Sequence, residues 1–241
     1  FILIGDHLQL PAVTLQTQEQ TVIKDEDLLA AGMRSTGESL FERLFRQCEE
    51  RQWEHAIGML TRQGRMHEEI MKFPSTKFYK GSLQLVNQQV DGIQRSNKIM
   101  GVIDWPEDPW SRLLRQSRTI FIPVQVDNNQ ISGKSNANEG KIVSEIIHAW
   151  QKILQVNKIE WNDMTCGVIT PFRVQISTIQ NSLSARGLEN LPITIDTVER
   201  YQGGARNIII ISTSISAISQ LEQISSLNQD AMDRKLNVAL T

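Results

Sequence analysis

Short apolar runs alternate with amphipathic stretches along this chain, and their order predicts an α/β fold. Short, continuous runs rich in β-branched residues are typical of strands that are buried on both faces of a sheet. The expected strands are Phe1–Ile4, Ile57–Leu60, Thr119–Val126, Gly167–Thr170, Ile193–Ile195, Ile208–Ser212 and Leu236–Leu240. Strands that alternate with helices indicate a mainly parallel sheet with helices on both faces.

The amphipathic stretches place their apolar residues on one helical face. One helix is expected from about Glu38 to Cys48, a second from about Glu139 to Leu154, and a third from near Arg173. Asn136 and Glu139 resemble a capping box at the start of the second helix, with Asn in the usual Ser or Thr position. Residues 14–37 and 87–116 are less regular, so we expect a linker and an excursion there.

Composition narrows the class of protein. The chain has 241 residues, of which 40% are hydrophobic and 22% charged, so it can bury a full core and is not expected to be disordered. A net charge of −2 provides no bulk basic field, so any nucleic-acid contact must come from a local groove. Cys48 and Cys166 lie far apart, without the spacing of a zinc site or a disulfide framework, which favours a cytoplasmic setting.

The sequence has no basic region followed by an apolar one near its start, and no apolar run is long enough to span a membrane, so no membrane targeting is expected. The densest run, Ile208–Ile211, is far too short for that purpose. The chain begins on Phe1 inside an apolar run, so we expect the sequence to come from a longer protein.

Polar segments next to apolar runs carry the candidate chemistry. They are Gly5–Pro11, Arg65–His67, Thr170–Gln175 and Asp196–Gly203. In an open parallel sheet, ligands bind at the carboxyl ends of the strands, where we expect these segments to lie. Each segment also has an ordinary structural interpretation: a strand-ending turn, a surface charge, a capped helix start and a polar loop.

The residue types in these segments suit phosphate chemistry. The Gln9 amide can donate to a phosphate oxygen and accept from an attacking water. The Arg65 guanidinium stays charged at any working pH and can bind phosphate oxygens through two donors. Thr170 and Arg173 flank a helix start, where backbone N–H groups, a hydroxyl and a cation can hold a nucleic-acid phosphate.

Taken in this order, the segments resemble the superfamily 1 DNA/RNA helicases, in the group of the nonsense-mediated-decay helicases. Gly5–Pro11 is similar to motif III, and Leu60–Leu83 to the Gln-Tyr-Arg-Met-His block with its Phe-Pro-Ser and Phe-Tyr-x-Gly elements. Thr170–Gln175 resembles Thr-Pro-Tyr-x-x-Gln. Asp196–Gly203 resembles motif V, and Leu236–Thr241 resembles the opening of motif VI.

The resemblance implies a RecA-like P-loop NTPase fold and a division of the chain. Residues 1–37 would be the end of the first RecA-like domain with a linker, and residues 38–241 the second motor domain, ending within motif VI. ATP and Mg²⁺ would bind between the two domains of the intact protein, with the first domain as a partner in cis and the protein a monomer. The chain alone is expected to bind no cofactor and hydrolyse no ATP, since it lacks the P-loop Lys and the Mg²⁺-binding carboxylates.

Roles for individual residues follow from the same resemblance. Asp6, Gln9, Arg65 and Gly203 would lie at the nucleotide, with Gln9 coupling the γ-phosphate to domain movement and Arg65 acting as arginine finger. Thr170, Arg173, Thr197 and Gln202 would bind single-stranded nucleic acid. No metal ligand is expected.

Departures from the family pattern keep other functions open. Gly64 replaces the family Tyr before the finger, and Ala205 replaces the Glu of motif V. A module that binds nucleic acid or a partner without ATP, on a degenerate helicase fold, is therefore an alternative. A second alternative is a phosphotransferase whose P-loop is Asn128–Ser135, although Asn128 stands where a phosphate cradle needs Gly, which favours an ordinary loop with a solvated Lys134.

Overall fold

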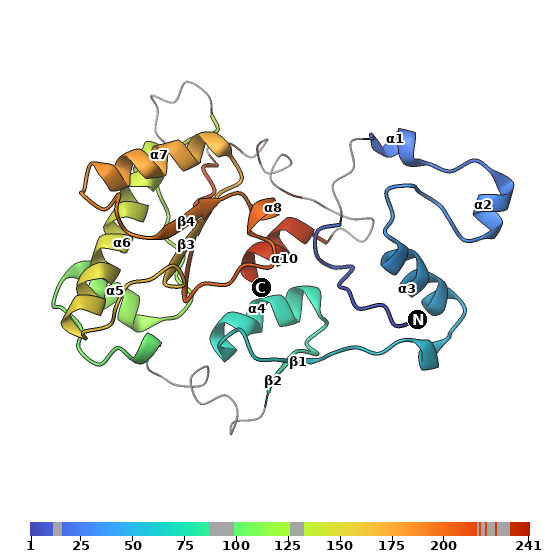
Figure 1. The fold of residues 1–241 in the computed structure, drawn as a ribbon, viewed down its shortest axis with the longest axis horizontal. Coiled ribbons are helices and arrows are strands. Elements are labelled where there is room, and N and C mark those ends of the chain that lie inside the picture. The colour runs from blue at the N-terminus through green and yellow to red at the C-terminus, as the bar shows by residue number, and fades with distance from the viewer. Residues whose placement is uncertain are drawn as a thin grey trace. The chain divides into compact units, whose positions relative to one another are not determined.

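A parallel sheet forms the centre of the fold in the computed structural model (Figure 1). Its strands are β3 (Cys166–Ile169), β4 (Ile193–Asp196) and β5 (Ile208–Ile211), in the order β4-β3-β5. In the register of this sheet, Val168 lies opposite Ile195 on one side and Ile210 on the other. The three strands are among those expected from the sequence, and the α/β fold class with a parallel sheet is confirmed.

The structure describes residues 1–11, 16–86, 99–125, 133–215, 217, 220, 225 and 232–241. Contacts within the chain divide it into an N-terminal unit, Phe1–Arg62, and a C-terminal unit, Gln63–Thr241. The predicted division after residue 37 concerns motor domains rather than contacts, and it stays a prediction.

One face of the sheet is covered by α6 (Ala137–Val156) and α7 (Arg173–Ser184). Alternate strand residues point to this face, so that Cys166 and Val168 join a buried cluster with residues of both helices. Ile147 and Ile153 of α6 and Ile179 of α7 are fully buried in it. The two helices were expected from their apolar stripes, and their packing explains why those stripes exist.

Close approach of α6 and α7 depends on Gly140. A Cβ atom at this position would lie 2.9 Å from Ser182 Oγ and 3.3 Å from the Thr178 carbonyl oxygen. Near the helix starts, Asn136 and Gln175 exchange hydrogen bonds, and farther along Arg186 Nε donates to Ser144 Oγ at 3.2 Å. The two helices therefore run side by side in the same direction.

The opposite face of the sheet is covered in part by α8 (Val198–Tyr201). The Tyr201 ring lies over Gly167 so closely that a Cβ atom there would meet the Tyr201 hydroxyl. Arg206 lies 5.8 Å from the centre of this ring and donates from Nη2 to Thr194 Oγ1 at 2.9 Å. Ile209 and Ile211 on the same face are more than a third exposed.

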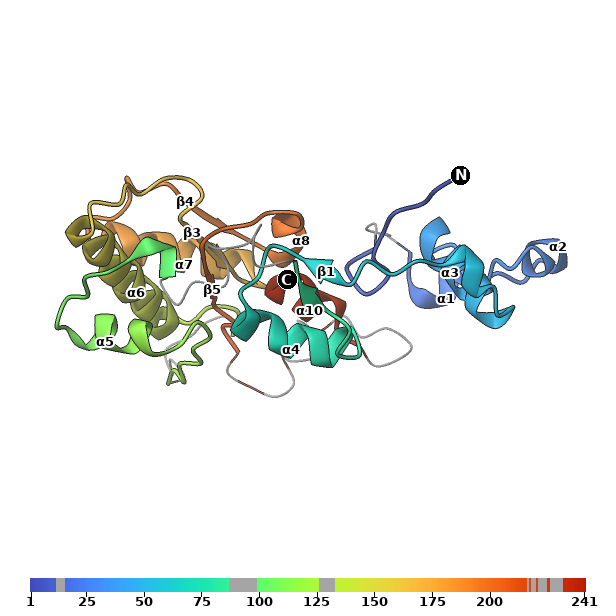
Figure 2. The same ribbon diagram turned by 90° about the horizontal axis from the view of Figure 1, so that it is seen from below.

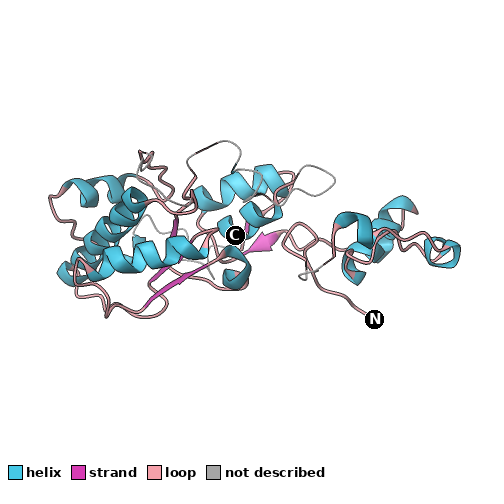
Figure 3. Ribbon diagram, turned by 90° about the horizontal axis from the view of Figure 1, so that it is seen from above, coloured by secondary structure: helices cyan, strands magenta, loops and turns pink. Residues whose placement is uncertain are grey.

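Further helices complete the C-terminal unit, and helices make up far more of it than strands (Figure 3). The remaining elements of this unit are α4 (Glu68–Phe78), β2 (Gln84–Leu85), η2 (Ile99–Gly101), α5 (Pro109–Gln116) and α10 (Arg234–Leu240), and β1 (Arg62–Gln63) spans the boundary between the two units. Helices α4 and α10 lie side by side (Figure 2), and Asn237 Nδ2 donates to the Tyr79 hydroxyl at 3.0 Å. Trp150 is in the core, and the Trp105 ring packs edge-on against it with ring centres 5.9 Å apart.

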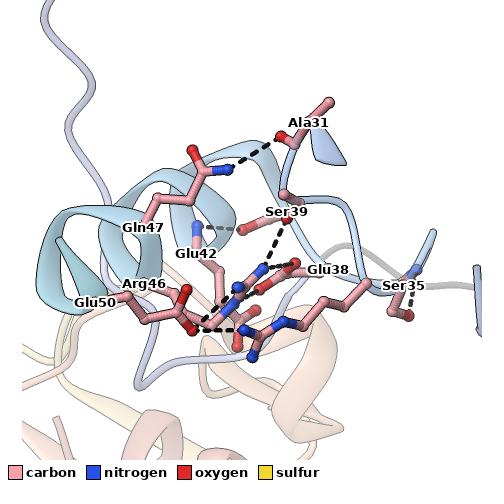
Figure 4. A network of polar contacts seen from close by, with 11 residues as sticks. Ala31, Ser35, Glu38, Ser39, Glu42, Arg46, Gln47 and Glu50 are labelled. Atoms are coloured by element: carbon pink, nitrogen blue, oxygen red, sulfur yellow. Dashed lines mark hydrogen bonds and ion pairs between the residues drawn. The ribbon is translucent and has the colours of Figure 1, made fainter. Parts of the chain in front are cut away.

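The N-terminal unit contains short helices: α1 (Gln18–Thr21), α2 (Glu26–Ala30), α3 (Leu40–Glu50) and η1 (Glu54–Ala56). A polar network holds α3 against the preceding loop (Figure 4). Arg46 donates to both carboxylate oxygens of Glu38, at 2.8 and 2.9 Å, and to the Gly32 carbonyl oxygen at 3.0 Å. Gln47 Nε2 donates to the Ala31 carbonyl oxygen at 3.0 Å. Neighbouring side chains of α3 therefore hold the loop through the carbonyl oxygens of Ala31 and Gly32.

Several expected strands are absent, and one is a helix. Leu236–Leu240 belongs to α10, because Asp233 caps that helix by accepting from the N–H groups of Lys235 and Leu236. Phe1–Ile4 and Ile57–Leu60 are not strands, since no neighbouring strand pairs with them among the residues described. Thr119–Gln125 is likewise unpaired, and Val126 lies outside the described residues. Short apolar runs alone do not separate strand from helix or from unpaired chain.

Two further properties concern the described residues alone. None of the described helices is both long and apolar enough to cross a membrane. Within the same residues, no group of three or more His, Cys, Asp or Glu side chains is placed to hold a metal ion.

Candidate functional site

Gln9 lies in a tight turn that Asp6 organises. The Asp6 carboxylate accepts from the Leu8 N–H at 3.0 Å and from Gln9 Nε2 at 2.9 Å. The Phe41 ring lies 3.0 Å from where a Cβ atom would stand at Gly5, and His7 stacks on Phe45 with ring centres 4.2 Å apart. The amide of Gln9 is therefore held by Asp6 within the N-terminal unit.

Arg65 stands on a loop that the Gln63 side chain shapes. Gln63 Oε1 accepts from the N–H groups of Arg65 at 2.9 Å and Met66 at 2.7 Å, and Gln63 Nε2 donates to the Met66 carbonyl oxygen at 2.9 Å. The Arg65 side chain is exposed, and its Nη1 donates to the Thr241 carbonyl oxygen at 3.3 Å. The backbone of the loop is thus fixed, while the guanidinium stays accessible at the end of α10.

His67 begins the helix that follows this loop. Its Nδ1 accepts from the Glu69 N–H at 3.2 Å and caps α4. Burial lowers the pKa of His67 below its usual value, and the positive charge of Arg118 lowers it further. Neutral imidazole is required at this cap, because a protonated Nδ1 has no lone pair with which to accept.

The carboxyl ends of β3 and β4 bring two predicted site residues to one edge of the sheet. The Thr170 N–H donates to the Asp196 carbonyl oxygen at 3.1 Å, and the Thr197 N–H donates to Asp196 Oδ1 at 2.8 Å. Thr170 is fully buried, and its Oγ1 has no hydrogen-bond partner among the described residues, whereas Thr197 is half-buried. Adjacent parallel strands therefore juxtapose these residues, as expected for strand ends in such a sheet.

Arg173, Gln202 and Gly203 are exposed near this edge. Arg173 is the first residue of α7, and among the described residues no carboxylate pairs with it. Gln202 and Gly203 form the turn after α8, where Gly203 adopts a φ of 80°, which favours glycine. These three residues are accessible to a ligand from solvent.

A salt bridge ties α8 to α10. Lys235 Nζ lies 3.0 Å from Glu199 Oε1. Burial opposes ionisation of Glu199, but its own backbone N–H and Lys235 stabilise the carboxylate more, so that its pKa is lowered. The segment that resembles motif V is therefore linked to the one that resembles the opening of motif VI.

Gln175 is the centre of a buried polar network that sequence reasoning did not identify. Its Oε1 accepts from the Asn136 N–H at 2.7 Å, and its Nε2 donates to the Asn136 carbonyl oxygen at 3.1 Å and to Ser212 Oγ at 3.0 Å. Ser212 Oγ in turn donates to Glu139 Oε2 at 2.7 Å, and the Ser214 N–H donates to both Glu139 carboxylate oxygens at 3.0 Å. The network joins the starts of α6 and α7 to the end of β5.

This network also changes the expected capping box. Asn136 accepts from the Glu139 N–H at 3.1 Å, as a capping residue does, but the Glu139 carboxylate bonds to Ser212 and Ser214. The sequence contained a signal for Gln175, namely an amide on the apolar stripe of α7. Its partners are too distant in sequence to be found from spacing.

The string that resembles a P-loop is described in part. Asn128–Ser132 lies outside the described residues, and Lys134 is exposed, with its Nζ 6.0 Å from the centre of the Phe172 ring. Lys134 therefore lies beside the start of α7.

Comparisons with known proteins match this architecture. A family model described as an AAA domain matches residues 36–241. The probable helicase senataxin of Homo sapiens is 28% identical over 242 residues, covering the whole chain and 8% of that protein. The DNA replication ATP-dependent helicase/nuclease DNA2 of Xenopus laevis is 28% identical over 257 residues, covering the whole chain and 21% of that protein.

A third relative carries a different enzyme name. The 3'-5' exoribonuclease HELZ2 of Homo sapiens is 27% identical over 225 residues, covering 92% of the chain and 7% of that protein. The chain thus spans between 7% and 21% of the length of these three relatives.

Proposed function

The chain belongs to the AAA domain family and is a helicase-family domain of superfamily 1, and on this premise we propose that it is the C-terminal motor half of an ATP-dependent nucleic-acid helicase or translocase. In this proposal the chain supplies an arginine finger to the nucleotide and a groove to single-stranded nucleic acid. The first RecA-like domain is its partner in cis, in a monomer located in the cytoplasm.

One observation carries the strand-binding part of the proposal. Thr170 and Thr197 meet at one edge of the sheet, both bonded to Asp196, and Arg173 is exposed at the start of the adjacent helix. Hydroxyls, backbone N–H groups at helix starts and guanidinium groups bind nucleic-acid phosphates without reading sequence. A motor that moves along any strand needs this kind of contact. Gln202, exposed on the turn after α8, would extend it.

Burial of Thr170 defines how it would act. Its side chain is 0% exposed, so its hydroxyl does not reach solvent in this conformation. A buried hydroxyl without a partner costs roughly 1–3 kcal/mol. Movement of the edge that exposes Thr170 would relieve this cost when a phosphate binds.

The position of Arg65 supports the nucleotide part of the proposal. Its guanidinium contacts Thr241, the last residue of the segment that resembles the opening of motif VI. An exposed guanidinium on a fixed loop fits a polyphosphate, and ATP with Mg²⁺ would supply the γ-phosphoryl group that such a motor transfers to water. Arg65 would neutralise charge there, Gly203 would lie near the nucleotide, and Asp6 and Gln9 would act from the N-terminal unit.

Two departures favour a second candidate function, an ATP-independent module that binds nucleic acid or a partner. Gly64 provides no aromatic ring beside Arg65, and Ala205 provides no carboxylate. Ala205, at the position of the family Glu, accepts through its carbonyl oxygen from Arg206 Nη1 at 2.7 Å. These differences remove contacts to a nucleotide and leave the strand edge unchanged.

The experiment that tests the proposal measures ATP hydrolysis by the protein at its full natural length, with Arg65→Ala. An arginine finger contributes about 10³–10⁵ in turnover, so the variant should lose hydrolysis while strand binding and folding persist. Arg112→Ala, at an exposed position of α5, is the matched control and should behave as wild type. Near-normal turnover in Arg65→Ala would overturn the assignment. No hydrolysis in the wild type, with strand binding intact, would favour the second candidate.

A further inference from the structure

Lys134 and Phe172 form an aromatic and basic pair beside the strand edge. Lys134 Nζ is 6.0 Å from the centre of the Phe172 ring. Lys134 is exposed, and Phe172, the residue that precedes α7, is half-buried. A cation at this distance from a ring face is attracted by the ring quadrupole. A cation and an aromatic face are also the two groups with which proteins bind single strands.

The pairing is built into the fold. Asn136 follows Lys134 by two residues and is fixed to Gln175 through two hydrogen bonds, at 2.7 and 3.1 Å. Both Asn136 and Gln175 are at most 1% exposed. The buried contact therefore holds the loop that carries Lys134 against the helix start that carries Phe172.

Electrostatics at this position favour a polyanion. The starts of α6 and α7 lie next to each other and point the positive ends of their helix dipoles the same way. Arg173 adds a second exposed cation. Glu139 is the acidic residue at the start of α6, but its carboxylate oxygens already accept from Ser212 and Ser214. Among the described residues at these two helix starts, the exposed charged side chains beside Phe172 are thus Lys134 and Arg173.

We propose that Lys134 and Phe172 form a binding element for single-stranded nucleic acid, in which the Phe172 ring stacks on a base and Lys134 binds the adjacent backbone phosphate. The inference rests on the proposed function and extends its groove from Thr170 and Arg173 across the start of α6. In this proposal Lys134, the lysine of the string that resembles a P-loop, binds a phosphate of the nucleic-acid strand rather than a nucleotide. Because any base offers a π-face, the element accepts any sequence.

The test uses the full chain with labelled oligo(dT) and oligo(U) of about 12 nucleotides, within the usual site size of strand-binding modules. Phe172→Ala should weaken binding about tenfold, and Phe172→Tyr, which keeps an aromatic face, should restore it. A 2-aminopurine base in the oligonucleotide should be quenched by the wild type and by Phe172→Tyr, and much less by Phe172→Ala. The deoxy and ribo arms show which strand is preferred.

Lys134→Ala should change the salt dependence of strand binding, which distinguishes it from Phe172→Ala. Loss of one phosphate contact should reduce the slope of log K against log salt by about 0.7. Lys152→Ala removes the same charge from an exposed position near the other end of α6 and serves as control, with binding and slope unchanged. Thermal unfolding of every variant should match the wild type, since Lys134 is exposed and Phe172 is not in the core.

Three results would overturn the inference, and they differ from one another. Wild-type binding by Phe172→Ala and Lys134→Ala, with loss in Arg173→Ala and Thr197→Ala, refutes the element but leaves the proposed function standing. Absence of strand binding by the wild type refutes both. ATP binding that is lost in Lys134→Ala, with strand binding unchanged, would show that Lys134 serves a nucleotide.

Discussion

The N-terminal and C-terminal units of this chain are each stabilised internally by a different kind of contact. In the described part of the N-terminal unit, Ile23 is the buried hydrophobic side chain, at 8% exposed, and α3 buries none of its residues. In the C-terminal unit, Ile147, Ile153 and Ile179 are 0% exposed within one cluster beneath the sheet. One unit relies on polar contacts around Arg46, and the other on a hydrophobic core.

The difference between apolar burial and polar contacts predicts that the C-terminal unit is the more stable of the two. Apolar burial contributes about 25 cal/mol for each Å² removed from water, whereas partly exposed ion pairs contribute little after desolvation and side-chain ordering. The hydrophobic core of the C-terminal unit can therefore support both the buried polar network around Gln175 and the exposed residues at the edge of the sheet. In the N-terminal unit, Asp6 and Gln9 lie on a turn, and the structure around this turn is expected to unfold at a lower cost in free energy.

The largest effect is expected from truncation in the core. Ile153→Ala removes a fully buried side chain and should destabilise the C-terminal unit by about 2–5 kcal/mol, because it loses burial and leaves a cavity. Leu44→Ala, at a position 37% exposed on α3, should cost less than about 1 kcal/mol. Urea unfolding monitored separately in each unit by NMR measures both. Equal losses would remove the distinction between the units.

The next effect concerns the Gln175 network. Gln175→Leu leaves the buried Asn136 N–H without its acceptor, although the Asn136 carbonyl oxygen still accepts from the Gly140 N–H, and this should cost about 1–3 kcal/mol. Gln180→Leu, at an exposed position of the same helix, should change stability by less than about 0.5 kcal/mol. Thermal unfolding compares the two. A neutral Gln175→Leu would mean that the network does not hold α6 and α7 together.

A smaller effect is expected at the ion pair of the N-terminal unit. Arg46→Met breaks the double hydrogen bond to Glu38 and should cost about 1 kcal/mol, decreasing as salt rises. Arg34→Met, which removes a 62% exposed partner of Glu50, should cost less than about 0.5 kcal/mol. Unfolding at low and high ionic strength provides the readout. A loss in Arg46→Met that is independent of salt would point to packing of its stem instead.

The smallest effect is a pH dependence at the cap of α4. The pKa of His67 is lowered in the folded protein, so the unfolded chain binds a proton more readily as pH falls. The stability that depends on neutral His67 is complete above about pH 6.5 and is lost as pH falls toward the lowered folded value. NMR titration of the His67 ring gives the pKa directly, and His67→Asn, a cap that does not titrate, should abolish this part of the pH dependence. An ordinary or raised pKa would contradict the prediction.

Strong local patterns made the centre of the fold predictable. The stripes of α6 and α7 and the β-branched runs of β3, β4 and β5 each agree with the tertiary structure that they build. The prediction of a strand at Leu236–Leu240 is wrong, because Asp233 caps α10 and a capping residue before an apolar run is a sequence signal for a helix. Phe1–Ile4 has strand composition but no ladder partner among the described residues.

The candidate site was predictable only where local motifs determine it. Thr170 and Thr197 follow adjacent strands, and parallel pairing brings them together, as expected. The burial of Thr170 and the contact of Arg65 with Thr241 depend on tertiary packing, which spacing does not encode. The same holds for Lys134 and Phe172, which are brought together by hydrogen bonds between Asn136 and Gln175.

The most direct test of the central claim is strand-stimulated ATP hydrolysis by the protein at its full natural length, compared with its Gln9→Ala variant. We predict that single-stranded nucleic acid stimulates hydrolysis and that this stimulation is lost in Gln9→Ala, while strand binding persists. Hydrolysis that does not respond to the strand, or stimulation that survives in Gln9→Ala, would contradict the assignment of this chain to a nucleic-acid motor with Gln9 at its nucleotide.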